Sequence, residues 1–286
     1  MNEYIIHLDE LGVSTRVIDE GKGPAVLLLH GNPDNADEWK TLINILKTDF
    51  RCIAPDLPGY GRRGNTFALP KNYDYSVDAQ VGFVDALVKH LNIRGKMTLV
   101  VHDIGGIMGV PWAARNLDRL ESFVYTNTVV FPYTWFPTAY RWGSRTIGGR
   151  FIASLSMSAI GSSQGSLFRK IFSKQHPQLS PVELDRFTTD FALNSTAKQT
   201  TLREFRMLTR DDFFDGYDEM RRKIFDAVPT VAVWGEDDPY IGNRFVNELI
   251  TRNTVSLPDV GHWVPIVAAD VLSQHIRSLQ GDVGKG

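Results

Sequence analysis

Cysteine is nearly absent from this sequence. Of its 286 residues only Cys52 carries a thiol, so no disulfide can form within the chain. A chain of this length with 43% hydrophobic residues can bury a sizeable core without one, and the lack of cysteine fits a reducing compartment. The apolar residues around Cys52 indicate a buried strand position and not a reactive thiol.

An excess of charge and long apolar runs are missing as well. Lys and Arg number 31 and Asp and Glu number 33, a net charge of -2 that favours neither nucleic acid nor an anionic membrane as a partner. No window approaches the ~20 apolar residues that cross a bilayer. Residues 1–7 have neither the basic start nor the apolar stretch of a signal peptide. We therefore expect a cytoplasmic protein that does not bind membranes or nucleic acid.

What the sequence does contain is a regular alternation of strand-like and helix-like segments. Apolar runs at residues 25–30, 51–54, 98–101, 123–127 and 229–234 are separated by helical patterns such as 36–46 and 77–91. Residues 4–7 and 13–19 are predicted to form an opening hairpin. The pattern predicts an α/β fold with a mostly parallel central sheet and helices on both faces.

The alternation stops after residue 127. Residues 128–223 contain helical patterns and aromatic clusters but no strand-like run, and the sheet pattern resumes at residue 229. We predict a helical cap, or lid, at residues 128–223. It would be inserted into a core made of residues 1–127 and 224–286.

Residues 97–110, with the sequence M-T-L-V-V-H-D-I-G-G-I-M-G-V, predict a strand, a sharp turn and a helix. Asp103 stands at the turn, and Gly105 and Gly106 leave room for backbone segments to approach closely. A nucleophile elbow has this shape because the reacting side chain must project from a tight turn. The alternative is that Asp103 only caps the helix that follows.

The run His-Asp-x-Gly-Gly at residues 102–106 resembles the nucleophile motif of the α/β-hydrolase superfamily, in the branch that carries aspartate in place of serine. That branch contains the haloalkane dehalogenases and the epoxide hydrolases. The resemblance covers nearly the whole chain and implies an α/β-hydrolase fold with an inserted helical cap. It also implies the chain order nucleophile, acid, histidine, which Asp103, Asp238 and His262 follow.

For the acid and the histidine, too, a purely structural role is the alternative. In the family, the histidine is the base that activates water and the acid holds its tautomer. The family's Gly-x-x-Asp-Pro pattern selects Asp238, although Glu236 and Asp237 compete with it and Asp238 could be a turn residue before Pro239. His262 could be a solvated loop histidine, but it lies between Gly261 and the predicted final helix, where the family has its base.

The run His30-Gly31-Asn32-Pro33 follows the predicted strand at 25–30, where the superfamily builds its oxyanion hole. Backbone N–H groups of Asn32 and Ile104 would stabilise the charge that develops on the ester oxygen. The Asn32 side chain resembles the halide-binding amide of haloalkane dehalogenases, whereas epoxide hydrolases commonly carry an aromatic residue there. The alternative is an asparagine that only serves the turn.

One position departs from the dehalogenase pattern. Ile104 stands where haloalkane dehalogenases carry a tryptophan whose indole N–H donates to the halide. Isoleucine has no donor. A replacement would have to come from the cap, with Trp135 and Trp142 as the candidates.

The epoxide hydrolase pattern is also incomplete. Those enzymes use two cap tyrosines as proton donors, and Tyr133 or Tyr140 could be the first. Phe205 occupies the place of the second, and Tyr217 lies nearby but off the pattern. The alternative is that the cap aromatics only form an apolar floor. The predicted substrate pocket comprises Phe131, Tyr133, Trp135, Tyr140, Trp142, Phe205, Tyr217 and Trp263.

A nucleophilic carboxylate suits displacement at an sp3 carbon, because attack on an ester or amide would give an unstable anhydride. The expected intermediate is an alkyl ester of Asp103, which water activated by His262 hydrolyses. We predict a haloalkane dehalogenase-like hydrolase, with an epoxide hydrolase as the alternative and a non-catalytic binding protein as the alternative from another class. The expected partners are a small, largely apolar organic substrate and water. We expect no cofactor and no metal, and a monomer or homodimer.

Overall fold

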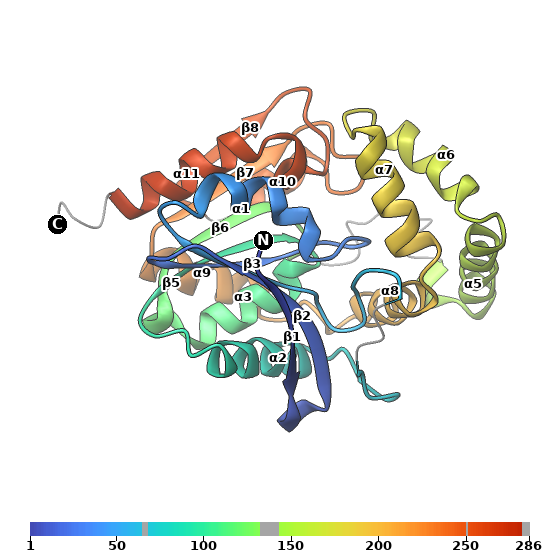
Figure 1. The fold of residues 1–286 in the computed structure, drawn as a ribbon, viewed down its shortest axis with the longest axis horizontal. Helices are drawn as coiled ribbons and strands as arrows, with labels where there is room; N and C mark the ends of the chain where they lie inside the picture. Colours follow the sequence, from blue (N-terminus) through green and yellow to red (C-terminus); the bar gives the residue numbers. More distant parts are fainter. Residues whose placement is uncertain (65–67, 132–142, 250, 282–286) are drawn as a thin grey trace.

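The computed structural model describes residues 1–64, 68–131, 143–249 and 251–281. Its centre is an eight-stranded sheet with the order β1-β2-β4-β3-β5-β6-β7-β8 (Figure 1). The β1–β2 and β2–β4 pairs are antiparallel and all later pairs are parallel. The strands are β1 Glu3–Leu8, β2 Val13–Glu20, β3 Ala25–Leu29, β4 Arg51–Pro55, β5 Met97–Asp103, β6 Leu120–Thr128, β7 Thr230–Gly235 and β8 Asn253–Leu257. The predicted α/β fold is confirmed.

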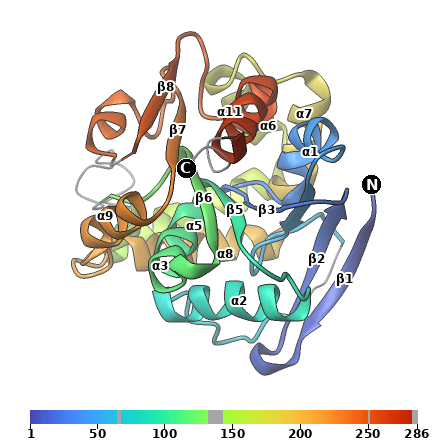
Figure 2. The same ribbon diagram turned by 90° about the vertical axis from the view of Figure 1, so that its left-hand side faces the viewer.

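Helices cover both faces of the sheet, as Figure 2 shows from the side. On one face α2 packs against α3, which in turn packs against α9. On the other face α1 packs against α11, and the short α10 lies beside both. These helices are α1 Lys40–Leu46, α2 Val77–His90, α3 Gly105–Arg115, α9 Tyr217–Ala227, α10 Val264–Val267 and α11 Ala269–Gly281.

The strands feed two apolar layers because successive side chains of a strand point to opposite faces. On β5, Leu99 and Val101 belong to the layer under α2 and α3, and Val100 belongs to the layer under α1 and α11. A strand buried on both faces must be apolar throughout, which explains why the central strands were visible in the sequence. Cys52 on β4 is buried in the second layer, and burial raises its pKa to about 12.

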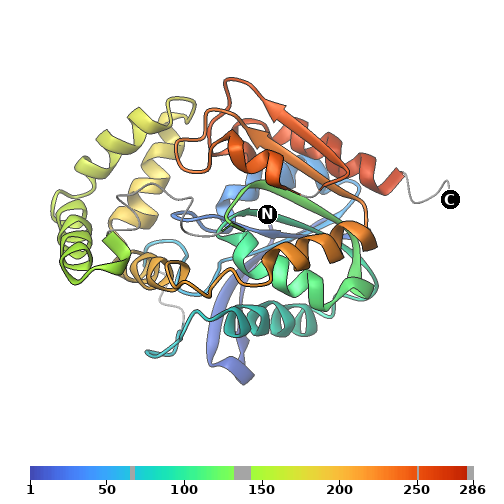
Figure 3. The same cartoon turned by 180° about the vertical axis from the view of Figure 1, so that it is seen from behind.

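Four helices lie beyond the carboxyl ends of the parallel strands, and Figures 1 and 3 show them as an arch at one end of the molecule. They are α5 Ile147–Ser162, α6 Ser166–Gln175, α7 Pro181–Phe187 and α8 Ser195–Leu208. Residues 143–216 contain no strand. Helix α9 begins within the segment predicted as the cap, but it packs along α3 and covers the sheet instead of the strand ends. Among the described residues, no helix has the length and apolar character that crossing a bilayer requires.

Candidate active site

Asp103 ends β5 in a sharp reversal of the backbone. Its φ of 45° lies in the left-handed region, and the pairing of β5 with β6 shifts register between His102 and Asp103. A Cβ on Gly105 would lie 2.2 Å from the backbone oxygen of Leu29, so only glycine fits at the start of α3. The N-cap residue of α3 is Ile104, whose side chain makes no capping hydrogen bond, so Asp103 does not occupy the N-cap position.

The Asp103 carboxylate is nearly enclosed and faces three groups. Its Oδ1 accepts a hydrogen bond of 2.7 Å from the Asn32 backbone N–H, and the Ile104 backbone N–H also donates to the carboxylate. Its Oδ2 lies 3.7 Å from Nε2 of His262. Burial raises the pKa of Asp103, while His262 and the two backbone donors act in the opposite direction. The carboxylate is thus oriented by fixed dipoles and shielded from water.

His262 lies between two carboxylates. Its Nδ1 is 2.7 Å from Oδ2 of Asp238, and its Nε2 has no hydrogen-bond partner in the described structure. Burial alone would raise the pKa of Asp238, but His262 and the backbone N–H groups of Tyr240 and Ile241 lower it below its ordinary value. The structure therefore brings together the three residues that the sequence selected.

The two acidic residues that compete with Asp238 in the sequence are not buried against His262. Asp237 is exposed and Glu236 is partly exposed, whereas Asp238 is buried against His262. Sequence position alone could not separate three consecutive acidic residues, because the choice depends on which side chain the loop turns inward.

Asn127 holds Asp238 in place, a role that the sequence analysis missed. At the end of β6, its Nδ2 donates to Oδ2 of Asp238 at 2.7 Å and its Oδ1 accepts from the Gly235 N–H at 2.9 Å. Its φ of 31° is in the left-handed region, which asparagine tolerates better than most residues. The signal available in the sequence was a polar residue near the end of a strand that is otherwise buried in the core.

A second buried pair lies beneath the nucleophile. His102 Nδ1 is 2.9 Å from Oε1 of Glu38, and its Nε2 is 2.9 Å from the backbone oxygen of His262. Burial lowers the pKa of His102, but Glu38 outweighs it and raises that pKa to about 9. Both ring nitrogens then carry hydrogens and donate. Because Glu38 also accepts from the Gly31 N–H at 3.1 Å, the pair connects the elbow, the loop after β3 and the loop of His262.

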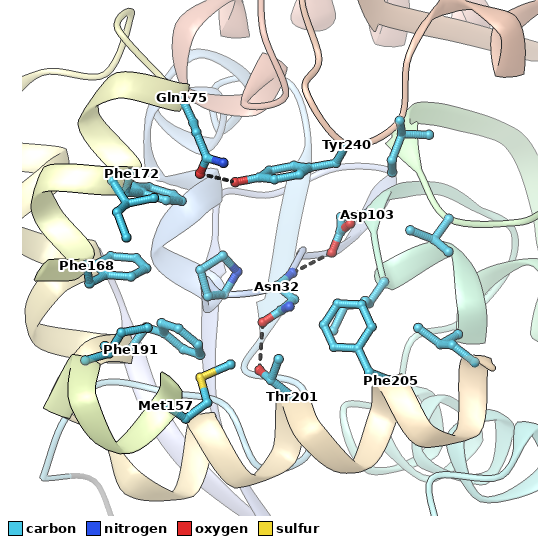
Figure 4. Close-up of a pocket in the computed structure, with 17 residues that line it drawn as sticks. Asn32, Asp103, Met157, Phe168, Phe172, Gln175, Phe191, Thr201, Phe205 and Tyr240 are labelled. Atoms are coloured by element: carbon cyan, nitrogen blue, oxygen red, sulfur yellow. Dashed lines mark hydrogen bonds between the residues drawn. The ribbon is translucent and has the colours of Figure 1, made fainter. Parts of the chain in front are cut away.

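The side-chain amide of Asn32 is oriented by a contact with α8. Thr201 on α8 donates from Oγ1 to Oδ1 of Asn32 at 2.8 Å (Figure 4). The amide nitrogen is then the group that Asn32 can present to the cavity above Asp103. In the part of the chain that the structure describes, no residue accepts a hydrogen from Nδ2 of Asn32.

A cavity of about 220 Å³ lies above Asp103, between the strand ends and α5, α6 and α8. Its lining is mostly apolar, with the polar groups of Asn32, Thr201, Gln175 and Tyr240 facing in from different elements (Figure 4). Tyr240 Oη lies 3.2 Å from Oε1 of Gln175. The apolar lining residues are Pro33, Ile104, Val129, Met157, Ile160, Phe168, Ile171, Phe172, Phe191, Phe205, Leu208 and Ile241.

The residues predicted to line the substrate pocket lie in several different parts of the structure. Phe205 lines the cavity, but the other three described residues do not. Phe131 packs on Phe245, Tyr217 donates to the Ile107 carbonyl at 2.7 Å, and Trp263 packs behind His262. The remaining four, Tyr133, Trp135, Tyr140 and Trp142, lie outside the described residues. The phenylalanines that do line the cavity come from residues 168–205, where only a helical pattern was visible in the sequence.

Among described residues there is no group of three or more histidine, cysteine, aspartate or glutamate side chains that could hold a metal ion. Asp103 and Asn32 line the cavity, and the buried His262 and Asp238 lie behind Asp103. The arrangement offers a carboxylate, a base and oriented donors, which is the set that covalent hydrolysis requires.

Two relatives are named cis-3-alkyl-4-alkyloxetan-2-one decarboxylase. The one from Shewanella oneidensis is 28% identical over 285 residues, which covers 94% of this chain and 86% of the relative. The one from Xanthomonas campestris is 38% identical over 126 residues, and this match covers only 42% of each chain. A haloalkane dehalogenase from Sphingobium indicum is 34% identical over 119 residues, covering 41% of this chain and 40% of its own.

Solved structures show the same fold. A solved structure described as one of novel epoxide hydrolases from metagenomes of hot environments has a TM-score of 0.74 at 25% identity, with 98% of both chains covered. A variant haloalkane dehalogenase from Agrobacterium tumefaciens has a TM-score of 0.77 at 20% identity, with 96% of both chains covered. A family model described as alpha/beta hydrolase fold matches residues 24–269. Because that match covers most of the chain, this protein belongs to the α/β-hydrolase family.

Proposed function

We propose that this protein hydrolyses the bond between an sp3 carbon and a leaving group, with Asp103 as the nucleophile. One observation carries the proposal. The Asp103 carboxylate lies at the elbow with Oδ2 3.7 Å from Nε2 of His262, a nitrogen that has no hydrogen-bond partner in the described structure. The distance leaves His262 free to act on a water molecule instead of binding the carboxylate.

In the first step an Asp103 oxygen attacks the substrate carbon and the leaving group departs with the bonding electrons. The product is an alkyl ester of Asp103. The apolar cavity favours this attack because a carboxylate with few water contacts is a stronger nucleophile. The backbone N–H groups of Asn32 and Ile104 keep the other carboxyl oxygen in place.

In the second step His262 takes a proton from water, which attacks the Asp103 carboxyl carbon. The charge on the carboxyl oxygen grows during this attack, and the same two backbone N–H groups stabilise it. Asp238, bonded to Nδ1 of His262 at 2.7 Å, holds the ring so that Nε2 is the basic nitrogen and stabilises the imidazolium that forms. Collapse of the intermediate releases an alcohol and restores the carboxylate.

A halide is the first candidate for the leaving group. It needs hydrogen-bond donors in an otherwise apolar site, and the Asn32 amide is such a donor at the cavity wall. The relative named haloalkane dehalogenase favours this assignment. Ile104 lines the cavity without a polar group, so Asn32 would supply the main side-chain donation among the described residues.

A strained ring that contains oxygen is the second candidate, either an epoxide or an oxetan-2-one. The Tyr240 hydroxyl lines the cavity, where it contacts Oε1 of Gln175 at 3.2 Å and Nε2 of His176 at 2.9 Å, and it would turn from Gln175 to donate to the oxygen that leaves as the ring opens. The relative that aligns with 94% of this chain is named for an oxetan-2-one substrate, and one structural neighbour is titled as epoxide hydrolases. Either ring presents an sp3 carbon to Asp103.

Turnover in water enriched in oxygen-18 tests the proposal. Because water attacks the Asp103 carboxyl carbon, repeated turnover should place the heavy isotope in the peptide that contains Asp103. The assay uses a bromoalkane, a chloroalkane, an epoxide and an oxetan-2-one in parallel, and protein without substrate is the control. Turnover with the label confined to the product would contradict a nucleophilic Asp103.

A further inference from the structure

A chain of buried polar groups lies behind Asn32 and is not used by the proposed mechanism. It begins at Glu204 on α8, whose Oε2 lies 2.5 Å from the hydroxyl of Tyr60 in the loop after β4. The Tyr60 hydroxyl lies 3.3 Å from Oγ1 of Thr201, which is 2.8 Å from Oδ1 of Asn32. Glu204, Tyr60 and Thr201 are each at most 5% exposed. The chain therefore joins a buried carboxyl group to the amide at the cavity wall.

We propose that Glu204 is a positioning residue, which determines through Tyr60 and Thr201 whether the Asn32 amide presents its nitrogen or its oxygen to the cavity. The inference deepens the proposed function and rests on it for its catalytic consequence. The switch itself is a property of the hydrogen bonds and can be measured without a substrate.

With a proton on Glu204, all the hydrogens can point the same way. The carboxyl O–H donates to Tyr60, Tyr60 donates to Thr201, and Thr201 donates to Oδ1 of Asn32. Nδ2 then faces the cavity as a donor. The Thr201–Asn32 contact has this direction in the structure, whereas Tyr60 donates to Glu204 there, so protonation of Glu204 reverses the Tyr60–Glu204 contact.

Without the proton the favourable direction reverses. An ionised Glu204 only accepts, so Tyr60 must donate to it and Thr201 can donate to Tyr60. Thr201 has one hydrogen, so it no longer donates to Asn32. The Asn32 amide then gains by turning over, because Nδ2 can donate to Thr201. Its oxygen would face the cavity and would repel a departing anion.

The surroundings of Glu204 favour the protonated form. Burial is the main cause that raises the pKa of Glu204, to about 8, with Asp103 adding to it and the Tyr60 hydrogen bond opposing it. Tyr73 and Tyr75, from the loop before α2, also face Glu204 and bring no positive charge. Since the pKa is raised, the donor orientation of Asn32 is present below about pH 8 and is lost as the pH rises through that value.

The direct test is the NMR signal of the Asn32 side-chain amide, in protein labelled with nitrogen-15 at asparagine. Asn32→Asp identifies the signal by its loss. In the wild type, the two amide hydrogens should shift with a midpoint near that of Glu204. In Glu204→Gln the signal should stay constant with pH, because a glutamine amide donates to Tyr60 in every condition.

Tyr60→Phe gives an independent variant that interrupts the chain and should also abolish the pH response. An Asn32 signal that does not move with pH in the wild type would overturn the inference. A signal that moves equally in Glu204→Gln would overturn it too, because the response would then come from another group such as the His102–Glu38 pair.

The catalytic consequence is measured as the rate of Asp103 alkylation by 1-bromohexane in a His262→Phe background. Above the midpoint this rate should fall by about 10-fold or more, the effect of one lost hydrogen bond to a charged group. Adding Glu204→Gln should reduce the fall to less than about twofold. Absence of any adduct would count against the proposed function alone, whereas an adduct with the same pH dependence in both backgrounds would count against the role of Glu204.

Discussion

At the scale of single residues, the site depends on which carboxylate is buried and where it faces. Asp103 ends one strand of the sheet and Asp237 and Asp238 follow another, but of these three only Asp103 and Asp238 are buried beside His262. The chemical identity of a side chain is thus less informative than its direction. The elbow at Asp103 fixes that direction through backbone geometry that glycine permits.

Replacing Asp103 by Asn should reduce turnover by at least about 1,000-fold, because a neutral amide is a poor nucleophile. The fold should be kept, since the side chain has nearly the same shape. Steady-state rates with the substrate panel measure the effect, and Asp237→Asn is the matched control on an exposed carboxylate that should stay within about twofold. Equal rates for both variants would refute the role of Asp103.

The contact between Asn127 and Asp238 leads to a prediction about stability. Asn127→Gly keeps the left-handed backbone but removes the donor to Asp238 and the acceptor for Gly235. The free energy of unfolding should fall by about 1–3 kcal/mol because buried polar groups lose their partners. Urea unfolding measures it. The control Asn92→Gly, at an exposed position with a similar φ of 49°, should change stability much less.

At the scale of elements, the strands and the elbow were predictable because both follow from local chemistry. A strand buried on two faces needs a continuous apolar run, and a tight turn needs glycine where backbones meet. The cavity lining was not predictable in the same way. Phe168 and Phe172 on α6 lie on a helix whose pattern is amphipathic, but no local signal says what its apolar face meets.

The buried His102–Glu38 pair connects elements, and its pH dependence follows from the pKa of His102. That pKa is raised to about 9 in the folded protein, against about 6.5 in an unfolded chain. The stabilisation is therefore fully present below about pH 6.5 and is lost as the pH rises through about 9.

Glu38→Gln should lower the free energy of unfolding near pH 6 by about 3 kcal/mol, because His102 loses its buried partner. Above that pH the variant should lose less further stability than the wild type, since His102 no longer holds an extra proton in the folded state. Urea unfolding at a series of pH values compares the two proteins. Parallel curves would show that the pair does not titrate as described.

At the scale of the whole molecule, the helices over the strand ends contribute both walls and orientation to the site. Arg186 at the end of α7 pairs with the buried Asp34 in the loop that carries Asn32, with Nη2 2.8 Å from Oδ2. Thr201 on α8 touches Asn32 itself. Such contacts between distant segments leave no sequence pattern, which explains why the sequence indicated the candidate catalytic residues but not the groups that orient them.

Arg186→Met should therefore destabilise the protein by about 3–5 kcal/mol, because Asp34 would remain buried without its cation. Burial raises the pKa of Asp34 to about 7 even beside Arg186, so the variant should also be more sensitive to alkaline conditions. Arg210→Met removes an exposed arginine paired with Asp212 and is the control, with an expected change below about 1 kcal/mol. Thermal and urea unfolding would detect the difference, and similar losses in both variants would speak against the buried pair.

The proposed mechanism requires a covalent ester on Asp103, and trapping that ester is the decisive experiment. His262→Phe should complete the first step but not the second, so incubation with 1-bromohexane should add one alkyl group to the intact mass. Peptide mapping should then place the group on Asp103. A folded variant that gains no mass from bromoalkanes, epoxides or oxetan-2-ones, or that carries the group on another carboxylate, would rule out Asp103 as the nucleophile.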